Sequence, residues 1–410
     1  MACYGIVKAL LRQGNEVELI MPAKEAVYFS LRKAEDADNP PVAFAERGKQ
    51  LTVQMTEEEL RRLIGSPLGV YYTTGRSTWT QQAFEQLKPS DPFKCILETL
   101  SDQYYIFRQV KQYTEMAVDI GSQLQFDVIH AHDWLTYPAG MVLKKLTGKP
   151  LVTHVHATEF DRAGGTGDGR IHDIEYLGLD YADRVITVSA YTANTVAQKY
   201  HTSTEKTRVV HNAYSTPNQT SHYRRIFKEP TVLFMGRITL QKGPDYFLEV
   251  ARRVLEQEKN VRFIMAGSGD MEKTVLHRAA SFGLGTKFLV AGFLDRNEVE
   301  KVLASTDIFI LPSVSEPFGI APLEAMSHGA VAIVSKNAGV AEIIHNAYKV
   351  DFWDIDQMVS IIIELIRDPA KFRQMSRRGK DEVANLQWEQ TAEKIADVFK
   401  ELEEVEVCLT

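Results

Sequence analysis

The chain has 410 residues, 44% of them hydrophobic and 25% charged, with a formal net charge of -7. This length favours two domains of roughly 200 residues, and the acidic balance argues against a nucleic-acid-binding protein, which needs a basic face for phosphates. The three cysteines are far apart without metal-ligand spacing, and no apolar run is long enough to span a bilayer. We therefore expect a soluble, cytoplasmic protein without a disulfide framework, a structural zinc site or an integral membrane segment.

Short β-branched segments alternate with longer segments of helical period along the whole chain. Helical patterns lie at Met1–Gly14, Gln103–Gln123, Asp245–Glu258, Asp295–Ser305 and Asp356–Ile366. The candidate strands of the first half are Glu16–Ile20, Asp127–His130, Leu151–His156, Arg184–Ser189 and Arg208–His211. Those of the second half are Thr231–Met235, Arg262–Ala266, Lys287–Ala291, Asp307–Leu311 and Ala330–Val334. This alternation predicts an α/β fold in which parallel sheets carry helices on both faces.

A polar, aperiodic stretch at Ala213–Pro230 separates the two halves. Such a composition marks a linker, so we expect one doubly wound, Rossmann-like domain at residues 1–215 and a second at residues 222–387, facing each other across a cleft. Residues 388–410 begin with a helical period, and we expect a terminal helix that packs back across the junction. Ligands of doubly wound sheets bind beyond the carboxyl ends of the strands, which is where the main motifs lie.

The strongest motif follows the strand Thr231–Met235. Gly236 lets the backbone approach a ligand closely, Arg237 offers a planar fork suited to phosphate, and Lys242 offers a point charge. A helix that begins near Pro244 adds free N–H groups and the positive end of its dipole. The motif predicts a diphosphate cradle, and the plain alternative is a polar turn that leads into a helix.

A second motif follows the strand Asp307–Leu311 and contains two carboxylates, Glu316 and Glu324. Glu316 and the N–H groups of Phe318 and Gly319 are suited to hold sugar hydroxyls together with an anionic group. Glu324, inside a helix, is suited to accept hydrogen bonds from vicinal ribose hydroxyls. A capping carboxylate and a solvated glutamate are the plain alternative, but the neighbours of Glu324 are apolar, and a buried carboxylate needs a partner.

Histidines gather where two candidate strands of the first half end: His130 and His132 with Asp133, and His154 with His156. Residues two apart on a strand share a face, so a metal site is one interpretation. We expect no metal, because a site of fixed geometry would need further ligands that the sequence does not place. One histidine of each pair is then a core or supporting residue.

Weaker signals lie elsewhere. Gly267 directly follows a strand and is a weak candidate for ligand contact. The glycine-dense segment Gly164–Gly169 does not follow a strand directly, so we expect a mobile loop. The aromatic residues of Tyr71–Trp79 form either a ligand platform or local core. Two Asp-x-Asp patterns, which begin at Asp36 and Asp354, are interpreted as chance.

Taken together, these motifs resemble the donor site of retaining GT-B glycosyltransferases, and more closely the glycogen and starch synthase-like branch among glycosyl transferases group 1. The resemblance runs from Met1 to about Phe399. The residues that carry it are Gly236-Arg237 with Lys242-Gly243, Glu316-Pro-Phe-Gly-x4-Glu324, His130-Ala-His132-Asp133-Trp134, His154-Val-His156, Val188-Ser189-x-Tyr191-Thr192, Val210-His211-Asn212-Ala213 and Gly339-Val-Ala-Glu342.

The resemblance implies roles for the matching positions. Arg237 and Lys242 would neutralise the diphosphate as the donor bond breaks, because fixed cations stabilise charge that develops in the transition state. Glu316 would bind hydroxyls of the donor sugar, and Glu324 the ribose. The other donor-binding residues implied are Gly236, Gly267, Phe318, Gly319 and Ile320. Residues 222–387 would then form the donor domain, and residues 1–215 the acceptor domain.

On the acceptor side, the resemblance implies that His156 lies near the reacting anomeric carbon, with Asp133 beside the sugar or the acceptor. The implied enzyme is a retaining hexosyltransferase, with a glucosyl unit favoured, that uses ADP-glucose or UDP-glucose. A carbohydrate would be the acceptor, with an α-glucan as the leading choice. The reaction needs neither metal nor cofactor, and the leaving phosphate helps to deprotonate the acceptor on the same face.

The family begins with a strand and a glycine-containing loop, whereas Met1–Gly14 here already has the pattern of the first helix. We therefore expect an N-terminal domain that lacks its first strand. We expect this chain to turn over poorly and a version with a restored N-terminal segment to turn over better; equal rates would contradict this. Two alternatives stay open: a catalytically impaired relative that binds nucleotide sugar, and a nucleotide-sugar epimerase of the same fold.

Overall fold

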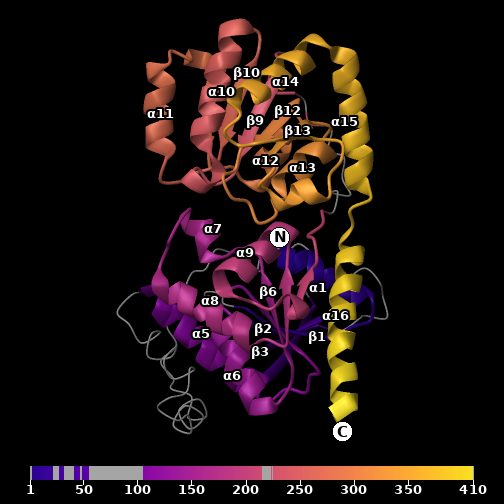
Figure 1. Ribbon diagram of the computed structural model, residues 1–410. Helices are drawn as coiled ribbons and strands as arrows, with labels where there is room; N and C mark the ends of the chain where they lie inside the picture. The colour runs from indigo at the N-terminus through magenta and orange to yellow at the C-terminus, as the bar shows by residue number, and fades with distance from the viewer. Residues whose placement is uncertain are drawn as a thin grey trace.

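The computed structural model describes residues 2–21, 27–31, 41–46, 49–54, 105–214, 223 and 225–409. These residues form two lobes, each built around a parallel sheet, and a small antiparallel sheet (Figure 1). The aromatic segment Tyr71–Trp79 and the pattern at Asp36 lie outside the described residues. The other Asp-x-Asp pattern has structural partners, because Asp354 caps a helix and Asp356 pairs with Arg253 at 2.5 Å.

The C-terminal sheet has six parallel strands in the order β11-β10-β9-β12-β13-β14. Their bounds are β9 (Thr231–Met235), β10 (Arg262–Ala266), β11 (Phe288–Gly292), β12 (Ile308–Leu311), β13 (Val331–Ser335) and β14 (Tyr348–Val350). The chain winds outward from β9 to one side, then returns and winds outward from β12 to the other side. This is the doubly wound order, whose ligand site lies where the winding reverses, beyond the ends of β9 and β12.

Apolar side chains on both faces of β9 explain its central place. Val232 and Phe234 pack on one face, which is covered by α10 (Pro244–Gln257), α11 (Glu272–Ser281) and α14 (Ile355–Arg367). Leu233 packs on the other face, which is covered by α12 (Arg296–Leu303), α13 (Ala321–Ser327) and α15 (Pro369–Ala384). A parallel strand covered in this way is apolar throughout, as the sequence predicted for this segment.

The N-terminal lobe contains four parallel strands, β5 (Ile129–His132), β6 (Leu151–Val155), β7 (Arg184–Thr187) and β8 (Thr207–Val209), in chain order. Helices α5 (Tyr105–Gly121), α6 (Tyr137–Thr147), α8 (Gly169–Tyr181) and α9 (Ala190–Tyr200) pack on one core. The other face of the sheet is covered by α1 (Ala2–Arg12) and α16 (Trp388–Leu409). The first residues therefore form the helix that the sequence predicted.

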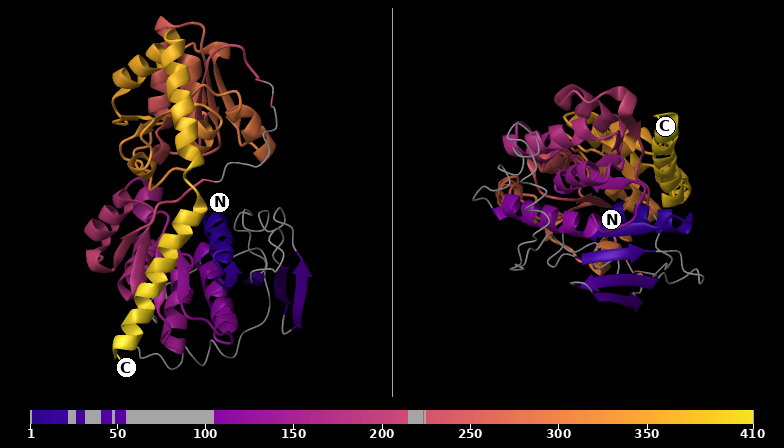
Figure 2. Two further views of the ribbon diagram at one scale, coloured as in Figure 1. Left: turned by 90° about the vertical axis from the view of Figure 1, so that its right-hand side faces the viewer. Right: turned by 90° about the horizontal axis from the view of Figure 1, so that it is seen from below.

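Helix α16 follows α15 of the C-terminal lobe and crosses to the N-terminal lobe, where it runs along the sheet (Figure 2). Its apolar face packs on Val152, Ile186 and Val210. At its start, Glu389 accepts a hydrogen bond from Arg12 of α1 at 2.6 Å. Near its end, Glu401 pairs with Arg184 and Arg208. The last helix thus belongs to the core of the first lobe.

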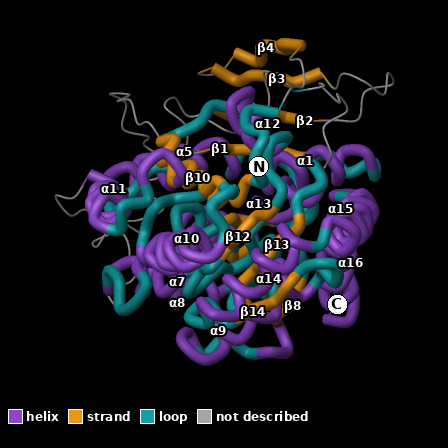
Figure 3. The backbone as a smooth tube through the Cα atoms, turned by 90° about the horizontal axis from the view of Figure 1, so that it is seen from above, coloured by secondary structure: helices purple, strands orange, loops and turns teal. Residues whose placement is uncertain are grey.

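One expectation is wrong in the described part of the chain. The segment predicted as the first parallel strand, β1 (Val17–Met21), pairs antiparallel with β2 (Val27–Leu31) and does not join β5. Strands β3 (Pro41–Glu46) and β4 (Lys49–Gln54) continue that separate sheet, which stands at the edge of the molecule (Figure 3). The physical reason is that β1 forms backbone pairs along its whole length with β2, while residues of β1 and β5 line a common cavity.

Candidate functional site

The loops that follow β9 and β12 are held together by backbone contacts. Gly243 has φ 69°, and a Cβ atom there would lie 2.1 Å from the carbonyl oxygen of Pro312. Only glycine fits at this position, because any side chain would collide with the backbone of the facing loop. The N–H of Val314 donates to the carbonyl of Gln241 at 2.9 Å. The two sequence motifs therefore meet where the winding of the sheet reverses.

Lys242 and Glu316 form an ion pair between these two loops. The Lys242 side chain is 16% exposed and that of Glu316 is 8% exposed. Charges so far removed from water are costly unless they are paired. The hydroxyl of Ser313 lies 3.5 Å from the same carboxylate oxygen of Glu316. The cation predicted for phosphate and the carboxylate predicted for sugar hydroxyls therefore share one site.

Arg237 lies five residues before Lys242, in the loop that follows β9, and is exposed. Its guanidinium donates to the side-chain oxygen of Gln241 at 3.1 Å, which leaves most of its N–H groups for a ligand. The preceding Gly236 donates its N–H to Ala266 at 3.0 Å. A Cβ atom on Gly267 would lie 1.8 Å from the Gly236 carbonyl oxygen. Gly267 thus has a packing reason to be glycine, and its contact with a donor stays a prediction.

Glu324 lies in α13, and its carboxylate accepts no hydrogen bond that the described residues provide. Burial, followed by the nearby charge of Glu300, raises the pKa of Glu324. A carboxylate in this position gains from a ligand that donates hydrogen bonds. Phe318 is only 3% exposed and belongs to the core, and Gly319 has φ 91°. Together with Ile320, the residue before α13, they remain predicted donor contacts.

Asp133 follows β5 with φ 58°, a conformation that is uncommon for any residue other than glycine. Its carboxylate accepts from the N–H groups of His156 at 2.8 Å and Ala157 at 3.3 Å. Burial raises its pKa to about 6, although Arg162 and the two N–H groups oppose that rise. Asp133 therefore holds the backbone of the loop that carries His156.

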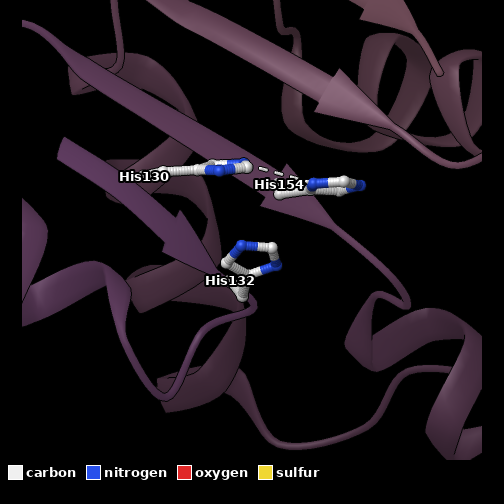
Figure 4. A group of neighbouring side chains, drawn as sticks. All are labelled: His130, His132 and His154. Carbon is white, nitrogen blue, oxygen red and sulfur yellow. Dashed lines mark hydrogen bonds between the residues drawn. The ribbon is translucent and has the colours of Figure 1, made fainter. Parts of the chain in front are cut away.

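Four histidines from β5 and the end of β6 stack on one face of the sheet. His130 Nε2 lies 3.2 Å from His154 Nδ1 (Figure 4). His132 Nδ1 lies 2.9 Å from His156 Nε2. Burial, with the neighbouring histidines, lowers the pKa of His132 to about 3 and burial lowers that of His156 to about 4. Burial and the neighbouring histidines also lower the pKa values of His130 and His154. The cluster is therefore uncharged at neutral pH.

Nitrogen atoms of His130, His132 and His154 lie within 4.8 Å of one another, so these residues could act as metal ligands. Two of the nitrogens, on His130 and His154, already form a hydrogen bond with each other. To bind an ion, this hydrogen bond would have to break, and the ring nitrogens would have to point toward a common position. The expectation of an enzyme without a metal stays a prediction.

The two lobes touch through the loop that carries Glu316. Ser315 donates its hydroxyl to Asp161 at 2.6 Å and lies 3.0 Å from the hydroxyl of Tyr191. Ser189 donates to the carbonyl of Pro317 at 2.6 Å. Asp161 belongs to α7 (Glu159–Ala163), where it forms a capping box with Thr158. The loop of the predicted sugar-binding glutamate is therefore fixed against the loop that begins at His156.

A second link between the lobes lies at the start of α9. The carboxylate of Glu342 accepts from the N–H groups of Ala190 and Tyr191, each at 2.9 Å, and from His211 at 2.7 Å. Burial alone would raise the pKa of Glu342, but the hydrogen bonds from His211 and from those two N–H groups lower it. The motifs around Ser189, His211 and Glu342 were noted in the sequence without a role. The structure shows that they join the lobes.

The residues that the sequence analysis missed are those that hold the site together: Ser315, Asp161, Gln241 and Arg162. Arg162 donates to the carbonyl of Ala157 at 2.7 Å and pairs with Glu175. The segment Gly164–Gly169 links α7 to α8 through left-handed glycines and the N-cap Asp168, and a Cβ atom on Gly164 would lie 3.8 Å from Leu240 of the donor loop. The capping pattern Thr158-x-x-Asp161, which the sequence analysis did not use, is a signal that could have found Asp161.

Comparison with known proteins identifies the class. The chain matches glycosyl transferases group 1 at residues 219–382 and glycosyltransferase family 4 at residues 96–216. It is 31% identical over 296 residues to an uncharacterized glycosyltransferase of Methanocaldococcus jannaschii, which covers 67% of this chain and 75% of that protein. It is 25% identical over 282 residues to a glycogen synthase of Mycobacterium tuberculosis, and the match covers 67% of this chain and 68% of that protein.

Solved structures agree on the fold. The catalytic domain of starch synthase IV from Arabidopsis thaliana, bound to ADP and acarbose, matches with a TM-score of 0.63 at 14% identity, over 98% of this chain and 95% of that one. Anabaena HepE in complex with UDP and glucose matches with a TM-score of 0.61 at 19% identity. The match covers 71% of this chain and 82% of that one. The fold is that of the GT-B glycosyltransferases, as predicted.

The chain therefore belongs to the glycosyl transferases group 1, and it is a glycosyltransferase that is similar in sequence to a glycogen synthase. The prediction of this family, made from the motifs, is confirmed. No helix in the described part of the chain is both long and apolar enough to cross a membrane.

Proposed function

We propose that this protein is a retaining glycosyltransferase that moves a hexosyl unit, with glucose favoured, from ADP- or UDP-sugar to an α-glucan. The observation that carries the proposal is the Lys242–Glu316 ion pair where the winding of the C-terminal sheet reverses. A relative named glycogen synthase supports the acceptor class. Structural neighbours bound to ADP or to UDP and glucose support the donor class. We also propose a cytoplasmic location, where such donors are made and thiols stay reduced.

In this proposal the donor diphosphate lies against Lys242 and Arg237. The incoming phosphates compete with Glu316 for the ammonium group, which frees the carboxylate to accept hydrogen bonds from sugar hydroxyls. As the anomeric bond breaks, negative charge grows on the leaving phosphate, and the two cations stabilise it where little water can reorganise. Glu324 receives the ribose hydroxyls, which offsets the cost of its burial.

On the acceptor side, His156 and Asp133 position the reacting groups. His156 is uncharged at neutral pH because its pKa is lowered by burial to about 4, so it can hydrogen-bond to the sugar without repelling a cation-like anomeric carbon. Asp133 fixes the His156 loop through two backbone N–H groups. We assign no covalent nucleophile; the leaving phosphate takes the acceptor proton on the face from which it departs, which retains the anomeric configuration.

The test is a panel of ADP- and UDP-sugars incubated with short α-glucans, with nucleoside diphosphate release and product stereochemistry followed together. We expect diphosphate release only when acceptor is present, and an α-linked product. An epimerised donor without acceptor would instead establish the epimerase alternative. Donor binding without turnover, by this chain and by an N-terminally extended one, would establish the binding-protein alternative.

A further inference from the structure

The carboxyl end of α13 carries a histidine whose ring contacts hydrogen-bond acceptors on two sides. His328 caps this helix, four positions after Glu324. We infer that His328 is a positioning residue for the donor site: its doubly protonated ring fixes the backbone of Glu324, and nucleotide binding weakens when the ring loses a proton. The part of this inference that concerns the nucleotide rests on the proposed function, whereas the protonation of the ring does not.

The contacts of the ring define its charge. Nδ1 of His328 lies 2.9 Å from the backbone carbonyl oxygen of Glu324, and Nε2 lies 2.9 Å from a carboxylate oxygen of Glu300. A carbonyl oxygen and an ionised carboxylate only accept hydrogen bonds, so each ring nitrogen has to donate. A neutral imidazole has one N–H and satisfies only one of the two contacts. The arrangement therefore belongs to the imidazolium form.

The hydroxyl of Ser327 supports this assignment. It donates to the same carbonyl oxygen of Glu324 at 2.7 Å, and its oxygen lies 3.2 Å from Nδ1 of His328. Because the single hydroxyl proton is used by the carbonyl, the serine oxygen can only accept a hydrogen bond from Nδ1. Every polar contact of the ring within the described residues is thus with an acceptor.

The ion pair between His328 and Glu300 is largely removed from water. The two side chains are 17% and 18% exposed, and they join the end of α13 to α12. A hydrogen bond between charged groups is stronger than a neutral one, and a low local dielectric strengthens it further. A cation at the carboxyl end of a helix also interacts favourably with the helix dipole. The imidazolium therefore holds α13 in place more firmly than a neutral ring would.

The titratable groups around the end of α13 come from α12, from α13 itself and from the segment after β8: Arg296, Glu300, Glu324 and Tyr214. Burial raises the pKa of Tyr214 to about 12, so this hydroxyl does not ionise near neutral pH. From α15, the hydroxyl of Ser376 donates to the carbonyl of Gly329, next to His328. Within the described residues, only Glu300 forms an ion pair with His328.

The charge of His328 also acts on the carboxylate of Glu324. Burial raises the pKa of Glu324, and the charge of Glu300 adds to this rise. The positive charges of Arg296 and His328 oppose it. When His328 loses its second proton, the ring keeps one of its two contacts, and the charge of Glu300 is no longer offset beside an anionic nucleotide. Nucleotide affinity is therefore complete below the titration of His328 and falls as the pH rises through it.

Nuclear magnetic resonance of the full chain with nitrogen-15-labelled histidine rings tests the protonation. The signals of His328 are assigned from their absence in His328→Gln. We expect both ring nitrogens to carry protons at pH 6.0. Glu300→Gln keeps an acceptor at Nε2 but removes the opposite charge, so it should lower the midpoint of the His328 titration by about one pH unit. A ring that is neutral at pH 6.0, or a midpoint that is unchanged in Glu300→Gln, would overturn the inference.

Calorimetric binding of ADP and of UDP at pH 6.0 and pH 9.0 tests the effect on the donor site. Because the nucleotides also titrate in this range, each Kd of His328→Gln is compared with that of the parent at the same pH. We expect the variant to bind about fivefold more weakly at pH 6.0, the usual effect of a well-placed cation at the end of a helix, and within twofold of the parent at pH 9.0. The matched control is His277→Gln, at an exposed position of α11, which should bind like the parent at both pH values.

The possible outcomes separate the role of His328 from the proposed function. A ratio of the two Kd values that is the same at pH 6.0 and pH 9.0 would refute the role of His328 and leave the donor site standing. A parent protein that binds neither ADP nor UDP would refute the proposed donor site, and the role of His328 with it.

Discussion

The hydroxyl of Ser315 donates a hydrogen bond to the carboxylate of Asp161 at 2.6 Å. Ser315 precedes the glutamate proposed to hold the donor sugar, and Asp161 lies five residues beyond the histidine proposed to face the anomeric carbon. This hydrogen bond is one of several that join the two halves of the proposed site across the lobes. Such contacts fix the distance between the loop of Glu316 and the loop of His156, which neither lobe can fix alone.

Removing this hydrogen bond should cost activity without unfolding either lobe. We expect Ser315→Ala to lower kcat several-fold, because the relative position of the two loops loosens. A double-mutant cycle with Asp161→Asn should give a coupling of about 1 kcal/mol in transition-state energy. The control is Ser376→Ala, which removes a hydroxyl bond to Gly329 of 2.6 Å within one lobe. Fully additive effects of the two changes would contradict the prediction.

Loss of the ammonium group at residue 242 should be far more severe. We expect Lys242→Ala to lower kcat/KM for the donor by about 10² to 10³, the usual effect of removing one charge-stabilising donor. Lys336→Ala is the matched control, because it breaks an exposed ion pair of 2.8 Å with Asp351 in the same lobe. Initial rates at varied donor concentration measure both. A Lys242→Ala enzyme that keeps half of its rate would rule out a role at the diphosphate.

The carboxylate of residue 324 is expected to act in binding. Glu324→Gln should raise KM for the donor about 5- to 150-fold with little change in kcat, since a lost charged hydrogen bond is worth about 1–3 kcal/mol in both ground and transition states. The matched control is Glu364→Gln at an exposed position of α14, where the carboxylate pairs with Lys371 at 2.6 Å. If donor KM is the same in both variants, the ribose assignment is wrong.

Stability should fall in mild acid because of the histidine cluster. The folded-state pKa values of His132 and His156 are lowered to about 3 and about 4, while unfolded histidine titrates near 6.5. Between those values the unfolded chain binds more protons, so the free energy of unfolding drops as pH falls below about 6.5. From His156 alone we expect a loss of about 2 kcal/mol at pH 5.

Urea unfolding at pH 7.5 and pH 5.0 measures this difference. His156→Gln keeps a side chain that can hydrogen-bond to His132 but does not titrate, so its pH dependence should be weaker than that of the parent. His201→Gln, a change at an exposed histidine outside the cluster, is the matched control for the substitution itself. An equal loss in the parent and in His156→Gln would show that the cluster is not responsible.

Turnover should not require a metal. We expect the rate after exhaustive dialysis against EDTA to stay within twofold of the untreated enzyme, because Lys242 and Arg237 supply the charge that a cation would otherwise supply. Elemental analysis of the purified protein checks the histidine cluster directly. A stoichiometric ion that is lost in His130→Gln, together with activity that only that ion restores, would contradict both expectations.

Local sequence patterns predicted much of the fold. The bounds of β9 and β10 match the predicted strands, because each is a short run that is almost wholly apolar and is covered on both faces. Strand β5 begins and ends two residues later than predicted, so His132 lies within the strand. Strand β14 was missed, since its three residues, Tyr348–Val350, are too few to show a period.

The sequence by itself predicted the chemistry of the proposed site: a guanidinium, an ammonium group and two carboxylates in the segments that follow two apolar strands. Only the tertiary structure decided which of them meet. Lys242 and Glu316 are 74 residues apart, and Ser315 and Asp161 are 154 apart. Periodicity reports the face on which a residue lies, whereas contacts over such separations depend on strand order and on how the lobes pack.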